Sequence, residues 1–323
     1  MDKIHQKAIH HLLFHCACLQ SDDRLLILCD RLTYDLAEAF QHIANEVGDV
    51  ATVINIPLLS THGDEPPVFA ADAMKEATLI ISLCHYSLAH SKARVDAGLR
   101  GARFLSLPLY EWRLLEDPCV LVDFKAQQPI VEAFTQAFTD GNKVHVTTKL
   151  GTDIELDISG RVGNCCPGFV EKSGELGSPP DIESNVSPVE DGSNGIVVVD
   201  GSITHPEIGL LTSEIILKIR QGRIVEFSGK DKRILQVLEE MFYPDDSLRR
   251  ILAECGVGLN PAAKLTGMML TDEGVLGCMH FGFGSNHTVG GKNKVDFHLD
   301  FVFQEASLKV DDHPLLDEGV IKI

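Results

Sequence analysis

A short segment near the end of the chain, VDFHLDFVF (residues 295–303), places one imidazole between two carboxylates in an otherwise apolar run. Strict alternation of polar and apolar residues is typical of a β-strand with two different faces. One face would carry Phe297, Leu299, Phe301 and Phe303, and the other Asp296, His298 and Asp300. Because burial of an unpaired carboxylate costs several kcal/mol, the polar face needs a basic side chain, a hydrogen-bond network or a metal ion.

Further side chains of the types that bind metals occur in the second half of the chain. They are Glu183, Glu190, Glu254, His280 and His287. Imidazole nitrogens and carboxylate oxygens suit zinc, cobalt, manganese or ferrous iron, and two additional glutamates would suffice to bind or bridge a second ion. The alternative is a structural pair, in which His298 and Asp300 hydrogen-bond to each other and nearby lysines balance the charge.

The elements that must position these residues follow from the apolar periodicity. Residues 1–141 alternate short apolar segments with amphipathic stretches, which predicts a small, Rossmann-like parallel α/β sheet covered on both faces by helices. Its strands are expected at residues 24–29, 51–57, 78–84 and 102–108. No G-x-G-x-x-G segment follows the first strand, so the sequence does not support a dinucleotide cofactor.

Residues 142–323 are expected to form a second, mixed α+β domain that binds the metal. A hairpin should turn at Leu150 and Gly151, and a helical stretch should run from Lys232 to Cys255, with Glu254 at its end. A strand is expected within residues 274–284, and the glycines between His280 and His287 predict a loop. The segment 163–195, rich in glycine, proline, serine and acids, should be a surface loop or an active-site loop.

The composition argues against a nucleic-acid partner, a membrane span and a disulfide framework. The 323 residues carry a formal net charge of −19, which would repel the phosphate backbone of a nucleic acid. No apolar run approaches the roughly 18 residues of a membrane span, and we expect a cytoplasmic protein. Nine cysteines are too sparse for a disulfide framework, and the adjacent Cys165 and Cys166 have no assigned role.

Five segments in order, GTDIELDISGR, PDIESNVSPVEDGSNG, ECGVGLNP, GCMHFGFGSNHTVGG and FHLDFVF, resemble the aminopeptidase T family of metallopeptidases. The resemblance covers about residues 146–303 and implies a homodimer and a hydrolase of short peptides or small molecules, with water activated by one or two divalent ions. The implied metal ligands are Glu183, Glu254, His280, His298 and Asp300. Glu183 or Glu254 would also act as base, and His287, which replaces a family tyrosine, would hold or protonate the intermediate.

A shorter branch of the same superfamily holds a dihydroxypyridine ring-cleaving dioxygenase, which uses one ferrous ion on two histidines and an aspartate. By this resemblance His280, His298 and Asp300 would hold iron, and His90 in SLAHSKAR would be an acid or base near a hydroxylated N-heterocycle. Alternatively Ser91 simply caps a helix and His90 is solvated. The retained glutamates favour the hydrolase, whereas the compact length and His287 favour the dioxygenase. A binding module without turnover is a third possibility.

Overall fold

The computed structural model describes residues 2–48 and 50–323, and the chain divides into two compact units. The first unit comprises residues up to 125 together with 168–180, and the second comprises residues 126–167 and 181–323. The division falls within helix α5 (Phe124–Asp140), whereas the boundary expected from the sequence lies just after this helix. None of the helices formed by the described residues is long and apolar enough to cross a membrane.

The first unit is built on a parallel five-stranded sheet, and the predicted α/β class is confirmed. Its strands, in spatial order, are β2 (Ala51–Asn55), β1 (Leu25–Cys29), β3 (Leu79–Ser82), β4 (Arg103–Ser106) and β8 (Leu176–Gly177). Its α-helices are α1 (Lys3–His11), α2 (Tyr34–Ala44), α3 (Val68–Glu76) and α4 (Lys92–Leu99). A π-helical turn over Leu12–Cys16 extends α1, and three 3-10 turns cover Asn45–Val47, Leu114–Glu116 and Pro118–Leu121.

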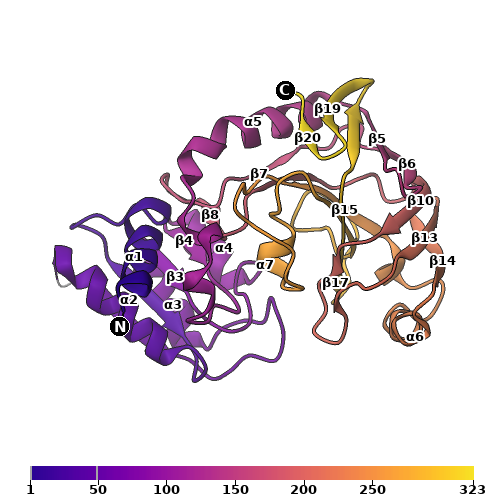
Figure 1. Ribbon diagram of the computed structural model, residues 1–323. Helices are drawn as coiled ribbons and strands as arrows, with labels where there is room; N and C mark the ends of the chain where they lie inside the picture. Colours follow the sequence, from indigo (N-terminus) through magenta and orange to yellow (C-terminus); the bar gives the residue numbers. More distant parts are fainter. Residues whose placement is uncertain (1, 49) are drawn as a thin grey trace. The chain divides into compact units, whose positions relative to one another are not determined.

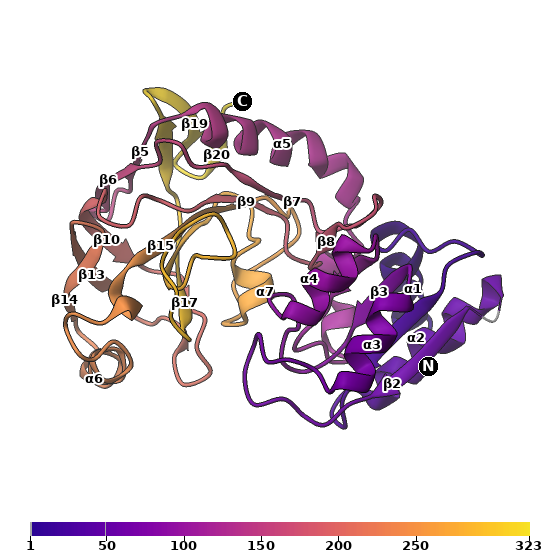
Figure 2. The ribbon, with the colours of Figure 1, turned by 180° about the vertical axis from the view of Figure 1, so that it is seen from behind.

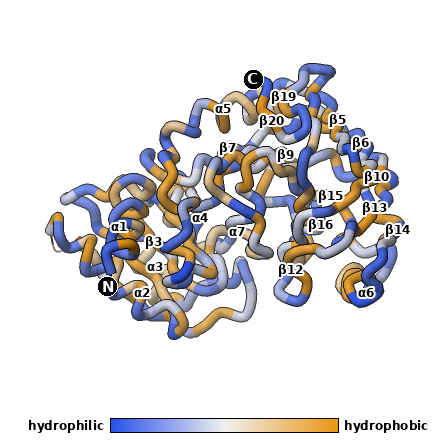
Figure 3. The backbone as a smooth tube through the Cα atoms, viewed as in Figure 1, coloured by the Kyte–Doolittle hydropathy of each residue, from blue (hydrophilic) through white to orange (hydrophobic). Residues whose placement is uncertain are grey.

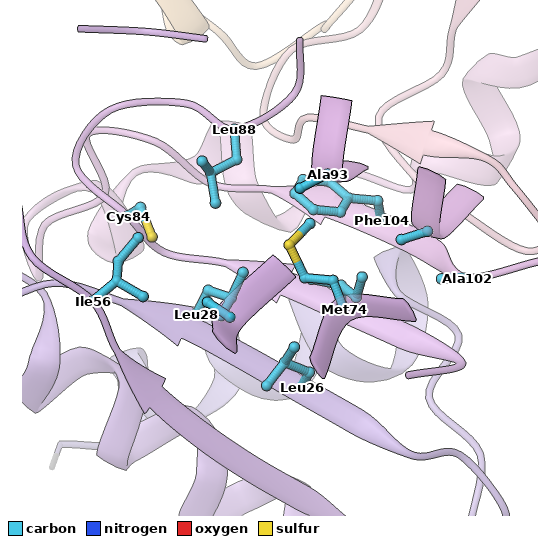
Figure 4. Close-up of a cluster of buried hydrophobic side chains, with 12 residues drawn as sticks. Leu26, Leu28, Ile56, Met74, Cys84, Leu88, Ala93, Ala102 and Phe104 are labelled. Carbon is cyan, nitrogen blue, oxygen red and sulfur yellow. The ribbon is translucent and has the colours of Figure 1, made fainter. Parts of the chain in front are cut away.

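The core of the first unit lies beside the central strands β1 and β3, whose residues are all buried. Both strands are continuous apolar runs, as a parallel sheet covered on two faces requires. Figure 4 shows Leu26 and Leu28 of β1 gathered with Met74 of α3 and Phe104 of β4. Each fully buried side chain of this size contributes roughly 1.5–3 kcal/mol relative to exposure, so the cluster is a main source of stability for this unit.

The second unit contains two antiparallel sheets. One has the order β14 (Arg223–Gly229), β13 (Ile215–Arg220), β10 (Asn194–Val199), β6 (Asp153–Asp157), β5 (Lys143–Thr147), β18 (Ser307–Val310), β19 (His313–Asp317), β20 (Val320–Ile321). The other has the order β12 (Gly209–Leu210), β11 (Ser202–Ile203), β17 (His298–Phe303), β16 (Met279–Gly284), β15 (Leu252–Gly258), β9 (Glu183–Val186), β7 (Asn164–Cys166). Its remaining elements are α6 (Lys232–Met241), α7 (Met269–Asp272) and a 3-10 turn at Leu248–Arg250. The hairpin predicted at Leu150 and Gly151 joins β5 to β6.

Two local predictions for residues 142–323 were wrong. The helix that was expected to reach Cys255 ends at Met241, because Pro244 has no N–H and restricts the residue before it. Glu254 therefore lies within strand β15. The segment 163–195 is more than a loop, since it contributes β7, β8 and β9. The strand expected within residues 274–284 is confirmed, because β16 continues to Gly284.

The sheet that contains β15, β16 and β17 has one apolar face. Phe281 and Phe301 are cross-strand neighbours on it, and Phe301 lies 5.4 Å from Phe283 between ring centroids. Phe242, which follows α6, packs against this face with its ring 6.1 Å from that of Phe301. In Figures 1 and 2 α6 lies next to β14. Figure 3 shows that α6 itself contains both hydrophobic and hydrophilic residues. The apolar face of the predicted strand is thus buried, as expected.

Candidate metal centre

The five ligands implied by the sequence lie on one face of four neighbouring strands. In the register of the sheet, Glu183 of β9 faces Gly258 of β15, and Glu254 of β15 faces Gly282 of β16. The same pairing sets His280 of β16 opposite Gly256 and Asp300 of β17 opposite Gly282. Because paired residues point to the same side of an antiparallel sheet, these side chains converge opposite the phenylalanine face.

The side chains form two groups that share Glu254. Candidate ligand atoms of Glu183, Glu254 and His280 all lie within 4.8 Å of one another, and those of Glu254, His298 and Asp300 do likewise. His280 Nε2 is 3.1 Å from Glu183 Oε2 and 3.8 Å from Glu254 Oε1. His298 Nε2 is 3.4 Å from Glu254 Oε2 and 3.1 Å from Asp300 Oδ1. Glu254 therefore lies between the two imidazoles.

Two glycines make room for the imidazoles. A Cβ atom on Gly256 would lie 2.0 Å from Nε2 of His280, and one on Gly282 would lie 2.5 Å from Nε2 of His298. Real Cβ atoms do not approach ring atoms so closely, so any larger residue would displace the rings. These two glycines, in the segments ECGVGLNP and MHFGFG, thus provide the space that the imidazoles occupy.

Hydrogen bonds from neighbouring groups orient several of these side chains. Asn185 donates from Nδ2 to Glu183 Oε1 at 2.7 Å. The carbonyl oxygen of Ser285 lies 2.9 Å from His298 Nδ1, so this nitrogen carries the proton of the neutral ring and Nε2 remains free to bind a metal. Such partners on the second nitrogen are the usual support of metal-binding histidines.

Two further carboxylic acids, Asp181 and Glu273, line the same buried region and were not recognised as site residues from the sequence. Burial raises the pKa of Asp181 well above its usual value, and the neighbouring Glu183 raises it further. Burial and the nearby Asp300 do the same to the pKa of Glu273. The only signals in the sequence were their positions, two residues before Glu183 and in the TDEG segment at the end of α7.

The two imidazoles compensate only part of this negative charge. Burial would raise the pKa of Glu254, but hydrogen bonds from His280 and His298 outweigh burial and hold the pKa well below its usual range. Conversely, burial would lower the pKa of His280, and Glu183 and Glu254 raise it well above the usual value. The residues therefore attract positive charge strongly, as a site for a divalent cation must.

The donor set fits such a cation. It offers imidazole nitrogens and carboxylate oxygens, which suit zinc, cobalt, manganese or ferrous iron. Two buried atoms that face no hydrogen-bond partner among the described residues are Asp181 Oδ1 and Glu273 Oε1. The side chain of His298 is 33% exposed, whereas His280, Glu183, Glu254 and Asp300 are at most 10% exposed. The centre is thus accessible to solvent at His298.

Other residues singled out in the sequence lie elsewhere. Asp296 is exposed and precedes β17, so it does not share the polar face with His298 and Asp300. His287 is also exposed, with Nδ1 2.8 Å from Ser285 Oγ, and its role stays a prediction. Glu190 accepts hydrogen bonds from groups outside the centre.

His90 belongs to the first unit. It is exposed in the turn that precedes α4. Ser91 caps this helix, since its side chain accepts a hydrogen bond from Arg94 N at 3.2 Å. The alternative interpretation of Ser91 as a helix cap is therefore confirmed, and the acid or base role of His90 stays a prediction.

Comparison with known proteins gives matches over nearly the whole chain. The family model described as 2,5-dihydroxypyridine 5,6-dioxygenase (NicX) matches residues 7–323. The 2,5-dihydroxypyridine dioxygenase of Pseudomonas putida KT2440 superposes with a TM-score of 0.85 at 20% identity, covering 99% of this chain and 97% of that one. AmpT of Thermus thermophilus, an aminopeptidase T, gives 0.73 at 14% identity, covering 99% of both chains. No curated protein matches significantly. Both resemblances noted in the sequence are confirmed.

Proposed function

The chain belongs to the 2,5-dihydroxypyridine 5,6-dioxygenase family, and from this premise we propose that it is a metal-dependent dioxygenase that opens the ring of a hydroxylated N-heterocycle. The observation that carries the proposal is the family match over residues 7–323, which includes every candidate ligand. This is the activity that the sequence analysis kept as the alternative to a hydrolase.

Under this proposal His280, His298 and Asp300 would hold the ion. Two imidazoles and one carboxylate are the ligand set of non-haem ferrous oxygenases, and ferrous iron supplies the activation of dioxygen when bound. Glu254 lies within 3.8 Å of His280 and 3.4 Å of His298, where its carboxylate can accept the proton of a substrate hydroxyl group. The substrate would approach on the exposed side of His298.

A second candidate, a metallohydrolase, is favoured by one specific observation. Glu183 and Glu254 are both present beside the imidazoles, and the two groups of ligand atoms share Glu254. The three side chains that a single iron would need are divided between these groups, an arrangement that suits two ions with a bridging carboxylate. In this hydrolase Glu183 or Glu254 would take a proton from the attacking water, and His287 would hold or protonate the tetrahedral intermediate.

Metal content and substrate turnover separate the two candidates. The protein would be purified without oxygen, and its metals counted by elemental analysis. About one iron per chain, with oxygen uptake on addition of 2,5-dihydroxypyridine, is the expected result. About two zinc, cobalt or manganese ions per chain, with release of p-nitroaniline from leucyl p-nitroanilide, would favour the hydrolase instead. A chain that retains no metal and turns over neither probe would contradict both.

The variant Glu183→Gln tests the same choice through one side chain. Glu183 is outside the three ligands of the proposed iron site, so the dioxygenase should keep most of its activity. A hydrolase that uses this carboxylate as ligand or base should lose about 100-fold or more in kcat. Glu155→Gln is the matched control, because Glu155 is an exposed residue of β6 that pairs with Lys143.

The homodimer implied by the resemblance also stays a proposal. It would be tested by the sedimentation of the purified chain, with a mass of twice 35.4 kDa as the expected result.

A further inference from the structure

The connection between β16 and β17 begins at a residue that contacts a candidate ligand. Ser285 directly follows β16, and its carbonyl oxygen accepts the hydrogen bond from His298 Nδ1 at 2.9 Å. This contact determines which nitrogen of the ring is free, and Nε2 then points toward Glu254 and Asp300. The position of the Ser285 carbonyl is therefore part of the geometry of the candidate metal centre.

Two buried asparagines fold this connection, residues 285–293, into a compact loop. Asn293 donates from its backbone N to Asn286 Oδ1 at 2.7 Å, and from Nδ2 to the carbonyl oxygen of Gly284 at 2.6 Å. A reciprocal hydrogen bond joins the same two residues, since the backbone N of Asn286 donates to the carbonyl oxygen of Asn293 at 3.0 Å. A Cβ atom on Gly291 would lie 2.0 Å from Asn286, which leaves no space for a larger residue. These contacts flank Ser285 on both sides.

One distant carboxylate attaches this loop to the rest of the second unit. Glu190 Oε1 accepts hydrogen bonds from Lys292 N at 2.6 Å and from Asn286 Nδ2 at 3.1 Å. Glu190 Oε2 accepts from Arg161 at 2.6 Å, and the other terminal nitrogen of Arg161 donates to the carbonyl oxygen of Gly290, also at 2.6 Å. The Arg161 side chain is 9% exposed, so this ion pair is shielded from water.

We propose that Glu190 is a positioning residue for the metal centre, which holds the Ser285 carbonyl against His298 through the loop 285–293. The inference rests on the proposed function, because it requires His298 to bind a metal. Glu190 has no contact with the ligands and acts through Asn286, the residue next to Ser285. Loss of such outer partners typically lowers metal affinity by about 10-fold to 100-fold.

Titration of the metal-free protein with Co²⁺ tests the proposal without any substrate. The visible absorption of bound Co²⁺ reports the geometry of its ligands, and a merely structural role of Glu190 would leave it unchanged. For Glu190→Gln we expect about a 10-fold loss of Co²⁺ affinity and a shifted spectrum, with an unchanged circular dichroism spectrum. The control Glu155→Gln removes the same charge from an exposed ion pair in the same unit and should bind Co²⁺ like the wild type.

A second variant keeps the test decisive if Glu190→Gln fails to fold. Arg161→Gln leaves the contacts of Glu190 with Asn286 and Lys292 in place and removes the ion pair together with the hydrogen bond to the carbonyl oxygen of Gly290, so we expect a smaller loss of affinity in the same direction. Wild-type affinity and spectrum in the folded variants would overturn the inference. Failure of the wild-type protein to bind Co²⁺ would instead count against the metal centre itself.

Discussion

Both units contain buried carboxylates, but they differ in how completely positive charge compensates them. In the first unit Arg103 donates to both carboxylate oxygens of Asp23 at 2.6 Å, and Thr78 donates to one of them at 2.7 Å. The other terminal nitrogen of Arg103 donates to the carbonyl oxygens of Ala17 and Cys18. In the second unit, five buried carboxyl groups surround two imidazoles: Asp181, Glu183, Glu254, Glu273 and Asp300.

This difference separates a structural ion pair from a binding site. The Asp23–Arg103 pair is complete, because one cation matches one anion and their polar atoms have partners. In the carboxylate cluster, by contrast, Asp181 Oδ1 and Glu273 Oε1 have no hydrogen-bond partner within the part of the chain that the structure describes. Burial of charge alone therefore does not indicate function, whereas incomplete compensation of buried charge does.

Breaking the complete pair should have the largest effect. Arg103→Met leaves the carboxylate of Asp23 buried without its cation, and we expect a loss of about 3–5 kcal/mol in the free energy of unfolding of the first unit. Trp112, the only tryptophan of the chain, lies in this unit and reports its unfolding in urea by fluorescence. The double variant Asp23→Asn with Arg103→Met should recover part of the loss. A change below about 1 kcal/mol in the single variant would contradict the assigned role of the pair.

Removing an acid from the incomplete cluster should affect metal binding and leave the fold intact. We expect Asp300→Asn to lower the affinity for Co²⁺ by more than about 100-fold, because it removes a ligand. The metal-free variant should stay folded, because the opposite face of β17 keeps Phe301 and Phe303 buried in the core. Asp296→Asn is the matched control, because Asp296 is exposed outside β17. Equal metal binding in both variants would remove Asp300 from the centre.

The smallest expected effect concerns pH and the Asp23–Arg103 pair. Burial would raise the pKa of Asp23, but the hydrogen bonds from Arg103 and Thr78 outweigh burial and lower it. A lowered folded-state pKa contributes stability above the unfolded-state value of 3.8, and this stability is lost as the pH falls through the folded-state pKa. The stability difference between wild type and Asp23→Asn should therefore be constant above about pH 5 and shrink toward pH 2. A pH-independent difference would contradict the shift.

The sequence predicted the parts of the molecule that depend on local periodicity. Four of the five strands of the first unit were located to within about two residues because continuous apolar runs between helices are a strong signal. The polar face of β17 was also recognised, since alternation shows directly that His298 and Asp300 are neighbours on one side.

Features that depend on distant pairing were missed. Glu254 was placed on a helix because LRRILAEC has helical character by itself, whereas its partners in β9 and β16 make this stretch a central strand. The short strands β7, β8 and β9 contain glycine, asparagine and cysteine, and only pairing with other strands makes them extended. Glu273 was overlooked because its partner Asp300 is brought to it by the fold, which no local pattern indicates.

The alternation of the two faces of β16 and β17 has a consequence for folding. His280 and Phe281 are adjacent in sequence and point to opposite faces, so a slip of one residue in the pairing would expose His280 to the phenylalanines and carry Phe281 among the carboxylates. Each wrongly paired sheet would thus lose both its apolar packing and its cation site. A metal ion present during refolding would therefore bind the sheet with the correct register and stabilise it over sheets with a slipped register.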